Sequence, residues 1–178
     1  MEFDVLLGMK KEEIGERTVY RREAVRGVIH EGEEILMVHT LDGDLKFPGG
    51  GVEKGECHEE TLRREVLEET GYTVQSVGRK IGQVVERRAD GMDRNGVFEM
   101  ISHYYVCEGA VKSGEQNLSD YEIDLDFQPR WVGLSEAWRS NEKLQEEKPG
   151  LRTWVKRETM VLSMLLHETG SSKMSWRS

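Results

Sequence analysis

The chain has 178 residues, a length that accommodates one well-buried core and leaves little room for a second. Apolar residues make up 37% and charged residues 33%, and no apolar run is long enough to span a bilayer, so the composition excludes a membrane protein. A formal net charge of −9 repels polyanions, which excludes an extended nucleic-acid surface but not a small phosphate compound carried with a metal ion.

The N-terminal segment does not have the pattern of an export signal. Residues 1–20 mix charges of both signs with apolar side chains, where a signal would have a basic start and an apolar middle. Cys57 and Cys107 are too few for a disulfide framework and form no C-x-x-C pair. We therefore expect a cytoplasmic protein with reduced cysteines and a single domain over residues 1–178.

The first half of the chain predicts a β-hairpin, a short strand and a helix. In chain order the expected elements are strand 19–30, strand 34–40, strand 45–47 and helix 57–70. The helix is the best supported, because acidic residues in its first turn suit the helix dipole and Gly71 can supply a left-handed end. A glycine-rich loop precedes it.

The second half predicts two long strands, a short strand and two helices. The expected ranges are strand 72–86, hairpin loop 87–95, strand 96–107, strand 130–133, helix 135–145, helix 151–167 and a frayed tail over 170–178. No internal repeat or linker divides these elements, in agreement with one continuous domain.

Three glutamates gather on one side of the first predicted helix. Glu65, Glu68 and Glu69 stand at i, i+3 and i+4, on an arc of roughly 100° beside the apolar stripe of that helix. Carboxylates held so close repel one another, and a bound cation would make the arrangement favourable. Ligand sets made only of oxygen suit a hard ion, in particular Mg²⁺.

The simplest alternative is that these glutamates form an ordinary solvated helix face. Their neighbours favour the metal site. Arg64 can orient one carboxylate through a bidentate ion pair, and Glu56 at the helix entrance can join the same network. The preceding glycines would let a main-chain carbonyl approach the same ion.

The segment 50–72 resembles the Nudix box at every specified position. The matching residues are Gly50-x5-Glu56-x7-Arg64-Glu65-Val66-x-Glu68-Glu69-x-Gly71-Tyr72. Tyr72 replaces the aliphatic residue that is more usual at the last position. The order of elements over roughly residues 18–140 is also similar to that of Nudix, or MutT-like, hydrolases.

The resemblance implies an α/β (α+β) Nudix fold in which a mixed β-sheet is sandwiched between helices. It implies hydrolysis of a diphosphate linkage with Mg²⁺, for which Mn²⁺ is a substitute. The metal ligands implied are the Gly49 carbonyl, Glu65, Glu68 and Glu69. Arg64 and Glu56 would orient these ligands.

The general base is open, because members of the family draw it from the box or from a later loop. In the segment LSDYEIDLDFQPRW we favour Glu122, which precedes the last strand and could fold over the metal. Glu65 is the alternative base, and simple surface acidity is the alternative interpretation of Glu122. Arg26 could contact a phosphate or face solvent.

The substrate follows only by elimination among subgroups of the family. The chain lacks an SQPWPF-like segment, a proline between Pro48 and Pro129, and a tyrosine soon after the box. These absences argue against enzymes acting on NADH, ADP-ribose and dinucleoside polyphosphates, respectively. A nucleoside triphosphate or related nucleotide is the leading small-molecule substrate.

The sequence argues against two other functions and one other metal. A catalytically silent Nudix module that senses a ligand or binds a partner would be expected to have a degenerate box, and this box retains every acid. Isomerisation of a diphosphate substrate lacks a suitable cysteine–acid pair. The histidines show no ligand spacing such as H-x-x-x-H, which does not favour zinc. A homodimer is expected only because family members frequently dimerise.

Overall fold

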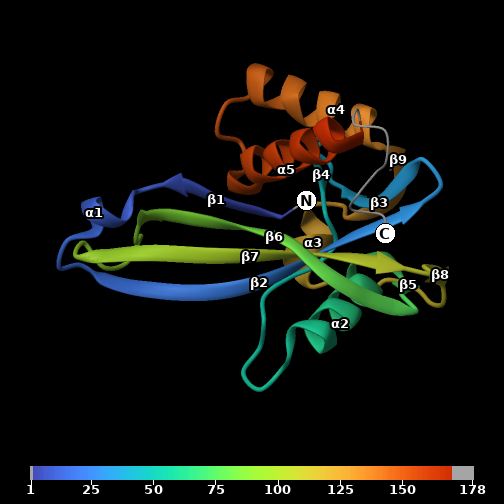
Figure 1. Cartoon of the computed structure of the whole chain (residues 1–178), viewed down its shortest axis with the longest axis horizontal. Helices are drawn as coiled ribbons and strands as arrows, with labels where there is room; N and C mark the ends of the chain where they lie inside the picture. The colour runs from blue at the N-terminus through green and yellow to red at the C-terminus, as the bar shows by residue number, and fades with distance from the viewer. Residues whose placement is uncertain (1, 170–178) are drawn as a thin grey trace.

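The computed structural model describes residues 2–169, and these residues form a mixed β-sheet with helices on both faces (Figure 1). Within them a seven-stranded sheet has the order β1-β6-β7-β2-β3-β4, and β9 pairs with β3. The strands are β1 (Phe3–Gly8), β2 (Thr18–Glu31), β3 (Glu34–His39), β4 (Leu45–Lys46), β5 (Tyr72–Thr73), β6 (Ser76–Ala89), β7 (Gly96–Glu108), β8 (Val111–Lys112) and β9 (Gln128–Gly133). The helices are α1 (Lys11–Ile14), α2 (His58–Thr70), α3 (Asp120–Asp124), α4 (Leu134–Glu147) and α5 (Thr153–Thr169).

Strand β2 is the centre of the fold. It pairs in parallel with β7 along most of its length and forms the predicted hairpin with β3, in which His30 faces Ile35. Side chains alternate across a strand. Val28 therefore packs under α4 and α5, whereas Val25 and Ile29 pack under α2. The predicted mixed sheet between helices is confirmed.

Two apolar cores lie on opposite faces of the sheet. The core under α5 gathers the apolar faces of the two C-terminal helices and of the strands, including Phe47, Tyr104, Val161, Leu162 and Leu165. The core under α2 is smaller and includes Leu62, Val66 and Cys107. The second core fixes the height of α2 above β2, and so positions the acidic side of that helix.

Several sequence expectations need correction. The predicted strand 72–86 is two strands, because β5 leaves the main sheet to pair with β8 and only β6 pairs with β7. Residues 3–8 were not expected to form a strand, yet β1 pairs in parallel with β6 and buries Phe3. Helix α3 was likewise missed. The tail 170–178 lies outside the described residues, and the expectation of a single domain stays a prediction.

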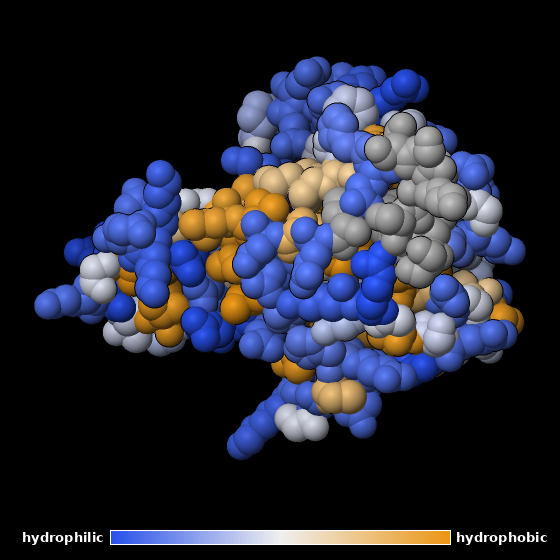
Figure 2. All heavy atoms as spheres, in the orientation of Figure 1, coloured by the Kyte–Doolittle hydropathy of each residue, from blue (hydrophilic) through white to orange (hydrophobic). Residues whose placement is uncertain are grey.

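Figure 2 shows the surface of the molecule around β1. Hydrophobic side chains gather over β1 and the adjoining end of α5, and hydrophilic side chains border them. Val5 and Leu7 of β1 pack against the larger core, whereas Leu6 faces outward. No helix among the described residues is both long and apolar enough to cross a membrane.

Candidate active site

Helix α2 forms where the sequence predicted it. The Cys57 N–H donates to the Glu60 carboxylate at 2.9 Å, which satisfies one of the free donors at the helix start. Gly71 adopts the left-handed conformation at φ 71° and donates its N–H to the Leu67 carbonyl at 2.7 Å, as expected of a glycine at a helix end. Burial of Leu62 and Val66 turns the adjacent glutamates toward the loop that precedes the helix.

That loop is fastened to β2, and its backbone requires glycine at Gly49. Gly49 has φ +135°, and a Cβ there would collide with the Val25 carbonyl. A Cβ on Gly50 would collide with the carboxylate of Glu65. The Val25 N–H donates to the Gly50 carbonyl at 2.9 Å, so the loop lies between the strand and the acids of the helix.

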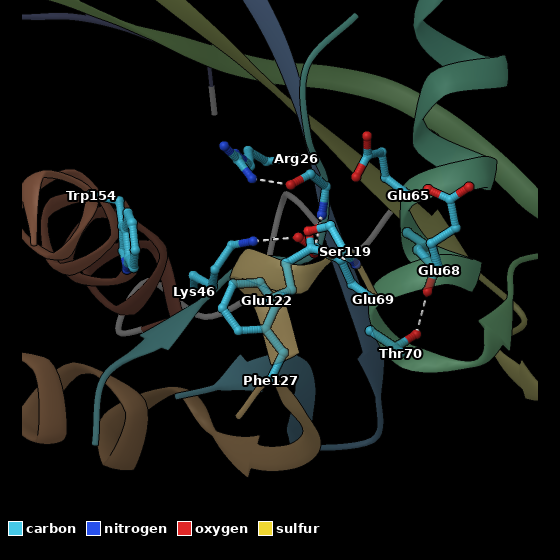
Figure 3. A network of polar contacts seen from close by, with 12 residues as sticks. Arg26, Lys46, Glu65, Glu68, Glu69, Thr70, Ser119, Glu122, Phe127 and Trp154 are labelled. Atoms are coloured by element: carbon cyan, nitrogen blue, oxygen red, sulfur yellow. Dashed lines mark hydrogen bonds and ion pairs between the residues drawn. The ribbon is translucent and has the colours of Figure 1, made fainter. Parts of the chain in front are cut away.

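The structure brings together three of the predicted carboxylates. One oxygen from each of Glu65, Glu69 and Glu122 lies within 4.8 Å of the other two. Glu122 comes from α3, so it meets the box acids from a separate element, as Figure 3 shows. Its Oε2 accepts from the Ser119 N–H at 2.8 Å, which holds the side chain at the start of that helix. Among the described residues, Glu68 is not a member of this group.

Arg64 organises the acids that flank the group. Its guanidinium donates to both oxygens of Glu56, at 2.8 and 2.9 Å, and also to Glu65 at 2.8 Å and Glu68 at 3.1 Å. The hydrogen bonds from Arg64, together with one from Thr61, lower the pKa of Glu56 to about 2. The same ion pairs raise the pKa of Arg64. Glu68 is therefore turned toward Arg64, four residues earlier on the helix.

The electrostatics of Glu65 favour a cation. Burial, the charge of Glu69 and, to a smaller extent, the charge of Glu68 raise the pKa of Glu65, although Arg64 opposes them. A carboxylate that is destabilised by its neighbours gains most from a divalent ion. The donors in the group are all carboxylate oxygens, a set that fits Mg²⁺ or Mn²⁺.

Two basic residues complete the site, and the sequence analysis missed one of them. Lys46 of β4 donates to Oε1 of Glu69, and both side chains are buried, at 8% and 2% exposed. The Gly49 N–H donates to the other oxygen of Glu69 at 2.9 Å. Arg26 donates to the Gly49 carbonyl, while its Nε is buried and, among the described residues, has no hydrogen-bond partner. Figure 3 shows Arg26 and Lys46 pointing toward the acids.

Two adjoining cavities open at these residues. The smaller, of about 250 Å³, is lined by the acids, Lys46, Arg26 and the box glycines. The larger, of about 360 Å³, includes Phe98, Arg87 and Arg88 among its walls. Trp154, Arg26 and Arg157 line both. The indole N–H of Trp154 donates to Asp44 at 2.6 Å, which fixes the ring between the two spaces.

Three aromatic side chains of β7 have different positions in the structure. Tyr104 is fully buried between Phe3 and Phe47, so it belongs to the core. Tyr105 contacts His58 on the α2 face. Phe98 lines the larger cavity, where the Arg88 guanidinium lies 4.7 Å from the centre of its ring.

A comparison with protein families supplies the decisive observation. The family model for the NUDIX domain matches residues 20–157, well over half of the chain. The chain belongs to the NUDIX family. The matched range contains most of β2, the box helix α2, α3 and the start of α5, and therefore every residue of the acidic group. The expected resemblance to MutT-like hydrolases is confirmed.

Similar proteins of known name are Nudix pyrophosphatases. A putative 8-oxo-dGTP diphosphatase of Bacillus subtilis (strain 168) is 40% identical over 114 residues, covering 62% of this chain and 74% of that protein. An ADP-ribose pyrophosphatase of Methanocaldococcus jannaschii is 30% identical over 128 residues, covering 68% and 74%, respectively. Family membership and these relatives support a pyrophosphohydrolase, as expected from the sequence.

Solved structures support the fold. The MutT protein from Bacillus halodurans superimposes with a TM-score of 0.51 and 21% identity, covering 66% of this chain and 72% of that chain. An ADP compounds hydrolase superimposes with a TM-score of 0.54 and 16% identity, covering 85% and 75%. At these identities the likeness concerns the fold alone.

Proposed function

We propose that this protein is a Mg²⁺-dependent pyrophosphohydrolase that cleaves the diphosphate linkage of a nucleoside triphosphate or a related nucleoside diphosphate derivative. The observation that carries the proposal is the group formed by Glu65, Glu69 and Glu122, which lines one cavity together with Lys46 and Arg26. Acids that bind a cation and basic groups that bind phosphate are both required when a metal-bound diphosphate is the substrate.

The proposed metal ligands are Glu65, Glu68, Glu69 and the carbonyl of Gly49. That carbonyl accepts a hydrogen bond from Arg26 but has a second lone pair for an ion. Glu68 would join the other metal ligands by turning away from Arg64, which donates one hydrogen bond of 3.1 Å to its carboxylate. When bound, Mg²⁺ supplies Lewis-acid polarisation of the phosphoryl oxygens and compensates their charge, and Mn²⁺ can substitute for it.

The protein's own residues would supply the general base and hold the metal ligands in position. Glu122 is our choice for the general base that takes a proton from the attacking water, because it faces the box acids from α3. Glu65 is the alternative base. Glu56 would hold Arg64 in place by accepting two hydrogen bonds from its guanidinium, and Arg64 would in turn orient the acids of the box.

Phosphate oxygens would be held by Arg26 and Lys46. Arg26 lines the cavity that holds the acids, and its buried Nε–H has no hydrogen-bond partner among the described residues. A donor buried without a partner is costly, and a phosphate oxygen would satisfy it. Lys46 lies beside Glu69, so it can bind a phosphate that also approaches the metal ligands.

The nucleoside would occupy the larger cavity, whose volume of about 360 Å³ lies at the lower end of the range for small-molecule sites. Trp154 and Phe98 offer aromatic faces there for a base. The relative named as a putative 8-oxo-dGTP diphosphatase favours a purine nucleoside triphosphate. The relative named as an ADP-ribose pyrophosphatase makes ADP-ribose the second candidate, although the proline found after the box in many such enzymes is absent here.

A catalytically silent binding module is the competing class of function. Every acid of the box is present, which argues against it. The cytoplasmic location and the homodimer expected from the sequence stay predictions.

The test is release of phosphate or pyrophosphate from a panel of nucleoside triphosphates, 8-oxo-dGTP and ADP-ribose in the presence of Mg²⁺. Glu69→Gln should lower kcat/KM at least about 100-fold on the preferred substrate, since metal and charge stabilisation supply several kcal/mol. The matched control is Glu59→Gln, which changes an exposed glutamate of the same helix that pairs with Arg63. Binding without turnover across the panel would support the silent module instead.

A further inference from the structure

A second group of metal-binding side chains lies on the α2 face of the sheet, separate from the box acids. Glu23 of β2, His58 at the start of α2 and His103 of β7 each place one ligand atom within 4.8 Å of the other two. The Glu23 Oε2 atom is 3.3 Å from Nε2 of His58 and 3.9 Å from Nε2 of His103. Three separate elements therefore converge on one point.

His103 is buried between His58 and Glu23 without a hydrogen-bond partner among the described residues. Its side chain is 10% exposed, and among the described residues neither ring nitrogen has a hydrogen-bond partner. Buried polar atoms are normally satisfied, so an unpartnered imidazole between another histidine and a carboxylate calls for an explanation.

We propose that Glu23, His58 and His103 bind one Zn²⁺ ion, with water as the fourth ligand. Two imidazoles and a carboxylate form a ligand set typical of zinc and unlike the all-oxygen set of the box. In a tetrahedral zinc site with bonds of about 2.0–2.1 Å, ligand atoms stand roughly 3.3 Å apart. The distances of 3.3 and 3.9 Å thus need only a small adjustment.

Tyr105 can orient the His58 ring for metal binding. Its hydroxyl lies 2.7 Å from Nδ1 of His58, so Nδ1–H can donate to the tyrosine oxygen while Nε2 stays free for the metal. Zinc-binding histidines are normally oriented by such a bond on their second nitrogen. The ring centroids of His58 and His103 lie 4.6 Å apart, with 32° between the ring planes.

The proposed site also lies where a bound ion would brace helix α2 against the sheet. A metal at this point would tie the first turn of α2 to β2 and β7, and α2 carries the box acids. The Glu23 carbonyl already accepts the Val52 N–H at 3.0 Å, so the same residue also holds the box loop. Zinc would make the position of α2 less dependent on the small core beneath it. This inference does not depend on the proposed hydrolase function.

The test uses the full chain, stripped with a chelator and dialysed against Zn²⁺ with an excess of Mg²⁺ to occupy the box acids. We expect about one zinc per chain, and a Co²⁺-substituted sample with the visible absorption of tetrahedral cobalt. His58→Gln and Glu23→Gln should each weaken zinc binding by more than the roughly 10-fold expected for loss of an orienting partner in Tyr105→Phe. Both side chains are partly exposed, at 31% and 45%, so neither change removes core packing.

Two matched controls make the result decisive. His39→Gln changes a histidine of β3 outside the group and should retain zinc. The double variant Glu65→Gln, Glu69→Gln removes box acids and should also retain zinc. Wild-type protein that binds no zinc would overturn the proposal. So would zinc that persists in His58→Gln and Glu23→Gln, or zinc that is lost in the box double variant.

Discussion

Replacing Lys46 by methionine tests whether the acidic group needs a positive charge beside it. Lys46 pairs with Glu69 where both side chains are almost fully buried, and methionine keeps most of the apolar stem. Removing one partner of a buried ion pair costs about 3–5 kcal/mol, because the other charge stays buried without its counter-ion. The Gly49 N–H still donates to Glu69 at 2.9 Å, so we expect the free energy of unfolding to fall by about 3 kcal/mol, the lower end of this range.

The expected loss depends on the metal. In EDTA, a loss of about 3 kcal/mol lowers Tm by roughly 6–12 °C for a chain of this size. Saturating Mg²⁺ should restore much of the lost free energy of unfolding, because a divalent ion on the same carboxylates replaces the missing positive charge. A ligand at 100 times its Kd raises the free energy of unfolding of the protein that binds it by about 2.7 kcal/mol. The variant should therefore gain more from Mg²⁺ than the wild type does.

The assay is chemical unfolding of both proteins in EDTA and in a Mg²⁺ series. Lys143→Met is the matched control, because Lys143 pairs with Glu147 on an exposed helix surface, at 72% and 57% exposed. Such a pair is worth at most about 0.5 kcal/mol and should show no dependence on Mg²⁺. An equal loss for Lys46→Met with and without Mg²⁺ would refute the electrostatic coupling between Lys46 and the metal ligands.

Three further outcomes follow from other contacts. Because Arg64 lowers the pKa of Glu56 to about 2 from an ordinary 4.5, the pair stabilises the fold above about pH 4.5 and loses this effect as the pH falls toward 2. The free energy of unfolding, measured in urea, should therefore fall more steeply with decreasing pH in the wild type than in Glu56→Gln. Burial raises the pKa of Cys107 to about 12, so alkylation of native protein at pH 8 should label the exposed Cys57 alone, as mass spectrometry would reveal. Asn141→Leu should lower the free energy of unfolding, measured in urea, by about 3 kcal/mol. The buried Asn141 amide accepts a hydrogen bond from the Leu45 N–H and donates one to the Leu45 carbonyl, both at 2.8 Å, and leucine can make neither.

The parts of the molecule that depend on local sequence could be predicted. Helix α2, its left-handed end at Gly71 and the crowding of Glu65 and Glu69 all follow from spacing within one segment. The hairpin of β2 and β3 follows from alternation and a turn at Gly32. These features need no knowledge of distant partners, so a single sequence contains them.

The features that depend on distant partners could not be predicted. Strand β1 contains Asp4 and pairs with residues about eighty positions later, so its sequence alone resembled a mixed, charged terminus. Lys46 has no recurring pattern around it, and only the placement of β4 brings it to Glu69. His58 and His103 come from different elements, whereas spacing rules find ligands that share one helix.

Glu122 stands between these two cases. Its segment was selected because it precedes the last strand, but α3 was not expected, and α3 is what turns the carboxylate toward the box acids. A short helix with Ser119 before it and Glu122 at its third residue is a recognisable capping pattern. That signal was present in the sequence and could have identified the helix.

We propose that the carboxylates of α2 and α3 form a metal-dependent site for hydrolysis of a diphosphate linkage. The most direct measurement is hydrolysis of the preferred nucleotide by metal-stripped protein during a Mg²⁺ titration, with the Glu65→Gln, Glu69→Gln variant measured in parallel. We predict no turnover before Mg²⁺ is added, saturation as it is added, and loss of at least about 100-fold in the variant while its unfolding curve stays cooperative. Hydrolysis in EDTA, or a folded variant that hydrolyses as fast as the wild type, would contradict the account.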